Sequence, residues 1–174
     1  KWAGNVELYK PFENVIDEYY MQWKQAERIT TVAEFFDILG IFQQILNLAI
    51  NVIEGHLSQK KKENIYMKID QMFKHYSDLE IVKKNPELSK ITFERKVGFN
   101  IINIDPMNCD MFIVEKQILG LIRRIVEIVK TEEGYFPSLK YFIEENIFDY
   151  LMSNFSLLND LNLFTFLLKL FLIK

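Results

Sequence analysis

Two histidines and one cysteine are the side chains of this chain best suited to metal binding or nucleophilic chemistry. His56 follows Gly55 in a polar stretch. His75 and Asp78 lie three residues apart, a spacing that places both on one face of a helix. A zinc site needs at least a third protein ligand, and Asp70, five residues before His75, is at a poor angle to supply it. Since no His-Glu-x-x-His or Cys-x-x-Cys spacing occurs, we predict neither a metal nor a cofactor.

Cys109 lies near a predicted helix N-terminus, a position that lowers the pKa of a thiol. Asp105 and Asp110 act in the opposite direction, because neighbouring negative charge disfavours the thiolate. We therefore interpret Cys109 as a half-buried, unreactive thiol. A single cysteine also excludes a disulfide within the chain and fits a reducing compartment, so we expect an intracellular location, cytoplasmic or nuclear.

The carboxylates occur in groups that fit polar helix faces and a loop better than an acid–base pair. Catalysis by two carboxylates requires that they face one cleft in different environments. No nucleophile–base pair, glycine-rich phosphate loop or nucleotide motif accompanies them, so we predict that this chain is not an enzyme; a longer parent chain could still carry an active site elsewhere. The groups are Glu13, Asp17 and Glu18; Glu132 and Glu133; and Glu144, Glu145 and Asp149.

Two clusters of basic residues are candidates for contact with a protein partner. Lys60, Lys61 and Lys62 fall in a predicted polar loop, 56–62, and Arg123 and Arg124 interrupt an apolar helix. We expect both arginine heads to snorkel to one side of that helix, where an acidic partner would meet them. The net charge of −3 and the pI near 5.5 argue against nucleic acid as the partner.

The elements that must position these residues are predicted to be helices throughout. Apolar residues make up 49% of the 174 residues, and six Gly and four Pro leave long uninterrupted segments. Thr31 begins a Thr-Val-Ala-Glu capping box, and Gly55 suits the end of the same helix. Predicted helices cover residues 12–23, 31–54, 65–76, 78–84, 111–130, 139–152 (with a break near Asn146) and 161–174.

The segment from Val32 to Ile53 comes nearest to a membrane span. It carries Glu34, Asp37 and several amides, which would be costly in lipid, so we interpret it as a core helix and predict no membrane span. A later stretch, Phe99 to Ile104, is β-branched but has no evident partner strand, and we expect a helix end followed by an extended link. The predicted core residues are Trp23, Phe35, Phe42, Leu46, Ile122, Ile125 and Leu151.

The predicted last helix, 161–174, is apolar almost all round. If one side faces the preceding helix, then Leu163, Phe166, Leu167 and Leu170 point to sides where this chain has nothing to cover them. Phe166 and Leu170 are therefore further candidate partner-binding residues. We also expect the chain to be a segment of a longer protein whose next layer covers this helix.

The second half resembles armadillo or HEAT repeats, in Ile118–Val126, Phe136–Leu151 and Leu163–Leu172. A long helix, a turn with proline and a leucine-rich helix follow one another as in consecutive repeat units. The resemblance implies an all-α, right-handed helical-hairpin fold of about six to eight helices. It also implies one domain over 1–174, with N-terminal helices in 1–104 and repeat-like helices in 105–174.

Two functions follow from these observations. The first is a non-enzymatic scaffold segment of a larger helical-repeat protein, with protein partners or adjacent repeats as its contacts. The alternative is a compact helical bundle that holds a partner helix in an apolar groove, similar to Bcl-2-like modules, with the helix of Val32 to Ile53 at its centre.

Overall fold

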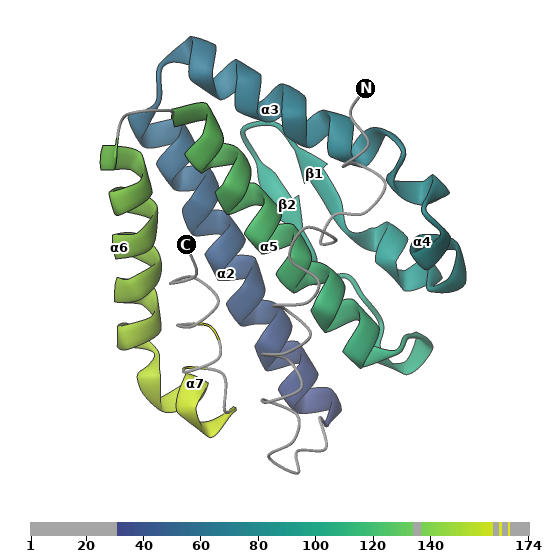
Figure 1. Cartoon of the computed structure of the whole chain (residues 1–174). Coiled ribbons are helices and arrows are strands. Elements are labelled where there is room, and N and C mark those ends of the chain that lie inside the picture. The colour runs from purple at the N-terminus through teal and green to yellow at the C-terminus, as the bar shows by residue number, and fades with distance from the viewer. Residues whose placement is uncertain (1–30, 134–136, 162–163, 165–166, 168–174) are drawn as a thin grey trace.

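A computed structural model describes residues 31–133, 137–161, 164 and 167. The described chain is mostly helical, as the sequence predicts, but it also contains a small β-hairpin, so the all-α prediction is corrected (Figure 1). No repeated helical-hairpin unit is found in these ranges. The elements are α2 (Val32–His56), α3 (Gln59–Lys74), α4 (Glu80–Lys84), β1 (Thr92–Glu94), β2 (Gly98–Asn100), α5 (Met111–Glu133), α6 (Pro137–Ser153) and α7 (Phe155–Asp160), with 3₁₀ turns at Tyr76–Asp78, Pro86–Lys90 and Pro106–Asn108.

The central element is α2, which packs against α5, α6 and β2 (Figure 1). Its start is as predicted, because the Thr31 hydroxyl accepts a hydrogen bond from the Glu34 N–H at 3.1 Å. The helix ends at His56, two residues beyond the predicted end, and Gly55 lies inside it.

By length and composition, Val32–Gly55 is also apolar enough to cross a membrane. A core helix and a signal segment share this property. In this protein, 56% of the apolar 18-residue stretch within the helix is buried.

Residues 56–62 do not form the polar loop that the sequence suggested. α3 starts at Gln59, so Lys60, Lys61 and Lys62 occupy its first turns. The Ser58 hydroxyl caps this helix by accepting from the Lys61 N–H at 3.4 Å. Further along, α3 buries one apolar face. Burial of that face stabilises the whole helix, including its lysine-rich first turns. The buried residues are Ile65, Tyr66, Ile69 and Met72.

The predicted helix end and extended link before Ile104 are wrong, because this region forms an antiparallel hairpin. Its strands pair Phe93 with Phe99, whose rings lie 4.7 Å apart. The connecting turn uses left-handed backbone at Lys96 (φ 68°) and at Gly98 (φ 111°). The partner strand could not be recognised in the sequence because each strand has only three residues, too few to establish an alternating pattern.

The C-terminal part differs from the prediction in three places. α6 continues through Asn146, because Ile147 and Leu151 are buried one turn apart beyond that residue. A short helix, α7, lies in the interval between the predicted helices 139–152 and 161–174. Leu167, predicted to be uncovered, is fully buried. Phe166 and Leu170 lie outside the described residues.

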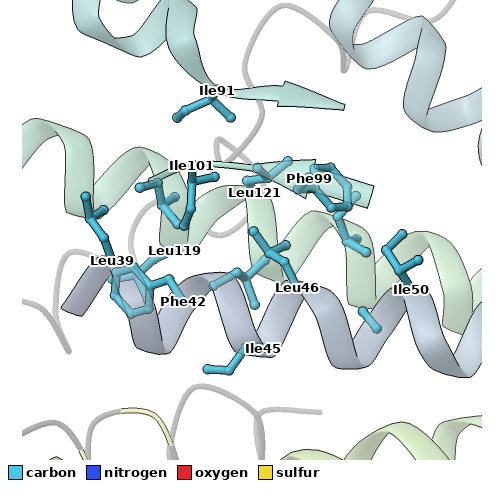
Figure 2. Close-up of a cluster of buried hydrophobic side chains, with 14 of the residues drawn as sticks. Leu39, Phe42, Ile45, Leu46, Ile50, Ile91, Phe99, Ile101, Leu119 and Leu121 are labelled. Atoms are coloured by element: carbon cyan, nitrogen blue, oxygen red, sulfur yellow. The ribbon is translucent and has the colours of Figure 1, made fainter. Parts of the chain in front are cut away.

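One contiguous core joins α2, the hairpin and α5. Figure 2 shows Phe42 and Leu46 from α2 together with Phe99 and Ile101 from the hairpin strand and the residue after it. Six of the predicted core residues are confirmed as buried, and Trp23 lies outside the described residues. The six are Phe35, Phe42, Leu46, Ile122, Ile125 and Leu151.

Candidate binding surfaces

His75 and Asp78 are close, but they form an exposed surface pair. Their Nδ1 and Oδ2 atoms lie 3.6 Å apart, and both side chains are mostly exposed in the 3₁₀ turn after α3. Asp70 binds elsewhere, with its Oδ2 atom 2.6 Å from Arg95 Nε. No group of three or more His, Cys, Asp or Glu side chains that could hold a metal ion occurs in the part of the chain that the structure describes.

Cys109 is half-buried, as its sequence context suggested. Burial raises the pKa of its thiol, and the Glu87, Asp110, Asp105 and Glu115 carboxylates raise it further. The thiol form is therefore favoured at neutral pH, which disfavours nucleophilic chemistry at this sulfur.

The lysine run at the start of α3 is divided between solvent and an internal contact. Lys60 is exposed, whereas Lys62 Nζ lies 3.3 Å from Glu54 Oε2 at the end of α2. The Tyr66 hydroxyl donates to the other oxygen of Glu54. This hydrogen bond, more than the lysine, holds the pKa of Glu54 below its usual value. Burial, followed by the Glu54 carboxylate, raises the pKa of Tyr66. Lys62 therefore helps to join α2 to α3.

Arg95, in the hairpin turn, connects the hairpin to α3. Its guanidinium lies 2.5 Å from Glu63 Oε1 through Nη1 and 2.6 Å from Asp70 Oδ2 through Nε. The two carboxylates raise the pKa of Arg95, Glu63 first. This cluster could not be predicted from the sequence, because Glu63 and Asp70 are 32 and 25 residues away from Arg95 and no local spacing connects them.

Arg123 and Arg124 do not share one solvent-facing side of α5, contrary to our expectation. Arg123 is only 4% exposed, and its burial lowers the pKa of the guanidinium, while the Glu127 carboxylate acts in the opposite direction. Arg124 is half-buried. The difference arises because successive helical residues point about 100° apart, and α5 is covered by α2, α3 and α6.

A cleft of about 350 Å³ lies between α3 and α5. Its polar lining carries charges of both signs: Lys68 from α3, and Arg124 and Glu127 from α5. The Thr131 hydroxyl at its edge donates to the Glu127 carbonyl at 2.8 Å. Ile128 and Gln71 complete the lining, so the cleft combines an apolar wall with polar groups that belong to both helices.

Among the described residues, the largest group of exposed apolar side chains that are close together in the sequence lies on α6 and α7. Phe148, Met152, Phe155 and Leu157 are 47, 50, 45 and 42% exposed, and we call these four residues the α6–α7 apolar face. Ile147, Leu151 and Leu158 of the same helices are buried instead. The Phe155 ring meets the Phe164 ring edge-on at 4.8 Å, which supports the end of this face.

Acidic residues border the α6–α7 apolar face. Glu145 and Asp149 are exposed on α6, and Asp160 is exposed at the end of α7. The sequence from Tyr141 to Leu168 contains no Lys, Arg or His. Within this stretch of sequence, the charged residues are therefore all acidic.

The interpretation of these surfaces has no support from known relatives. Comparison of the chain with protein-family models, curated proteins and solved structures gave no match. A functional proposal for this chain therefore rests on its own residues.

The α6–α7 apolar face was not among the sites predicted from sequence, although its spacing is regular. Phe148, Met152 and Phe155 follow one another at steps of four and three residues. The buried residues Ile147 and Leu151 have the same step of four, so the segment carries two neighbouring apolar stripes. Periodicity shows that a helix has apolar stripes, but it does not tell which stripe the rest of the protein covers.

Proposed function

We propose that this chain is a non-enzymatic helical module that binds a protein partner through the α6–α7 apolar face. The observation that carries the proposal is the exposure of the four members of that face, each more than 40% exposed. Several large apolar side chains exposed within one short segment are typical of sites that another protein covers. Met and Phe, which form three quarters of this set, are enriched in such interfaces.

Two forms of this module follow from the sequence, and the helix arrangement supports the compact one. In a segment of an armadillo-like or HEAT-like scaffold, each unit contacts only its neighbours along the chain. Here α2 packs directly against α6, with α3, α4, the hairpin and α5 between them in sequence. A central apolar helix with others around it is similar to the Bcl-2-like alternative, with the difference that the proposed contact surface is an outward helix face.

The location of this module is part of the same proposal. We infer an intracellular protein, which is supported by the single, half-buried cysteine and by the absence of any other cysteine in the sequence.

The test is selection of binders from a displayed library of helical peptides, using the purified chain as target. We expect enrichment of peptides that lose binding, by tenfold or more, when Phe148→Ala and Met152→Ala are introduced together. The matched control is Met107→Ala, since Met107 is 77% exposed and lies far along the chain from α6. Failure to enrich any peptide, or enriched peptides that bind the double variant as well as the parent, would overturn the proposal.

A further inference from the structure

We propose that the partner of the α6–α7 apolar face is a basic amphipathic helix of another protein. This inference rests on the proposed function and specifies its ligand. The partner's apolar side chains cover Phe148, Met152 and Phe155, and its Lys or Arg side chains lie opposite Glu145 and Asp149.

The positions along α6 place an apolar stripe beside an acidic stripe. Phe148 and Met152 are one helical turn apart, and Glu145 and Asp149 are likewise one turn apart. At about 100° per residue, all four positions fall on one side of the helix, with the acidic pair next to the apolar pair. All four side chains are exposed, while Ile147 and Leu151 face the core. A second helix lying along α6 would meet both stripes at once.

The length and the chemistry of the face fit a helix. The stripe from Glu145 to Met152 extends about 10 Å along α6, and the exposed Phe155 follows at the start of α7. Packing between two helices uses side chains three and four residues apart, and Phe148 and Met152 on α6 have this spacing. A methionine among aromatic rings adapts to anchors of different shape.

The charge beside the face selects the sign of the partner. Glu145, Asp149 and Asp160 are exposed, and no basic residue occurs between Tyr141 and Leu168. A surface of one sign attracts the opposite sign and repels its own. Anionic lipid and nucleic acid are therefore disfavoured at this face, and an amphipathic helix with Lys or Arg beside its apolar stripe is favoured.

The experiment compares three synthetic helices that share one apolar face of leucines and differ only in the polar positions, which are Lys, Glu or Gln. Binding of each labelled peptide to the full chain is measured by fluorescence anisotropy at low and at high salt. We expect the Lys peptide to bind at least tenfold more tightly than the Glu peptide, with the Gln peptide between them. Raising the salt should reduce this difference, since exposed charges are screened.

Two variants separate the charge from the apolar contact. Glu145→Gln with Asp149→Asn should weaken binding of the Lys peptide by roughly three- to tenfold and leave the affinity for the Gln peptide unchanged. The matched control is Asp78→Asn with Glu80→Gln, which removes two exposed acids elsewhere in the chain. This control should leave the affinity for both peptides unchanged. Circular dichroism of both double variants checks that the fold is retained.

The outcomes distinguish the two proposals. Equal binding of all three peptides, with loss in the Phe148→Ala and Met152→Ala double variant, would retain the binding module and overturn the basic partner. Absence of binding by every peptide would overturn both. Self-association that the same double variant abolishes would identify a second copy of the chain as the occupant, and binding to phosphatidylcholine vesicles that the variant abolishes would identify a membrane. Either result would overturn the basic helix.

Discussion

The side-chain amide of Gln43 in α2 bonds to the backbone on both sides of Asn100, as a neighbouring strand would. Its Nε2 donates to the Phe99 carbonyl at 2.8 Å, and its Oε1 accepts from the Ile101 N–H at 2.9 Å. The same Nε2 also lies 3.0 Å from Asn47 Oδ1, which fixes the orientation of the amide. One side chain thus satisfies two backbone groups of a hairpin that has only two strands.

Replacing Gln43 should therefore destabilise the protein through the hairpin. Gln43→Leu keeps the size of the side chain but leaves the Phe99 carbonyl and the Ile101 N–H without this partner, at a cost of about 2–4 kcal/mol. Urea unfolding followed by circular dichroism measures the change. Gln44→Leu is the matched control, because Gln44 is the exposed neighbour on α2 and should change stability by less than about 0.5 kcal/mol. Equal effects of the two variants would contradict the strand-like role.

Two phenylalanines of α2 provide a test of core packing. Phe42 is fully buried and lies in the cluster of Figure 2, so Phe42→Ala should cost about 3–5 kcal/mol. Phe36 is 49% exposed, and Phe36→Ala should cost less than about 1.5 kcal/mol. Thermal unfolding of both variants compares them directly. A melting temperature that Phe42→Ala leaves unchanged would show that this face of α2 is not the one that is packed.

Two glycines should respond oppositely to alanine. Gly98 has φ 111°, a conformation that strains any side chain, so Gly98→Ala should destabilise by about 1–3 kcal/mol. An added Cβ would itself meet only ordinary contact with Ile50 at 3.5 Å, so the cost comes from the backbone. Gly40 lies inside α2 with open space around it, and Gly40→Ala should stabilise by about 0.5–1 kcal/mol. Denaturant titration gives both values, and a neutral Gly98→Ala would refute the strained turn.

Tyr66 and Tyr76 should make stability fall at alkaline pH. Burial raises the pKa of both hydroxyls above the value of 10.0 that a tyrosine has in the unfolded chain. A raised pKa in the folded state means that the stabilising contribution is fully present below pH 10 and is lost as the pH rises above it. Tyr66→Phe should reduce this alkaline decline, measured as the free energy of unfolding against pH. Tyrosinate absorbance that appears in the folded protein at pH 10 for every tyrosine would contradict the prediction.

The sequence predicted local features well where a cap or a buried stripe determined them. The Thr31 cap and the buried face around Phe42 are both present. Contacts between segments that are distant in the sequence could not be predicted from such local patterns. Arg95 contacts Glu63, and Gln43 contacts Phe99, only in the folded chain. The local spacing of these residues does not predict either contact.

The candidate binding surface shows the same limit. The sequence indicates apolar side chains without cover, but it places them at Leu163, Phe166, Leu167 and Leu170. Leu167 is buried, while Phe148 and Met152, which follow the period of a normal core stripe, are exposed. The choice between two apolar stripes on one helix is made by the packing of α6 on α2 and α5, which is a property of the whole fold.

The position of α2 at the centre has a consequence for synthesis of the chain. The end of α2 and the start of α5 are 55 positions apart, and α6 follows later still. At about 5–20 residues per second, α2 waits roughly 3–10 s for the first of its covering helices. Of the elements in residues 31–133, only α3, α4, the hairpin and the 3₁₀ turns between them are made during this interval to cover a segment apolar enough to cross a membrane. The nascent chain is therefore most vulnerable to aggregation and most accessible to chaperones before α5 emerges from the ribosome.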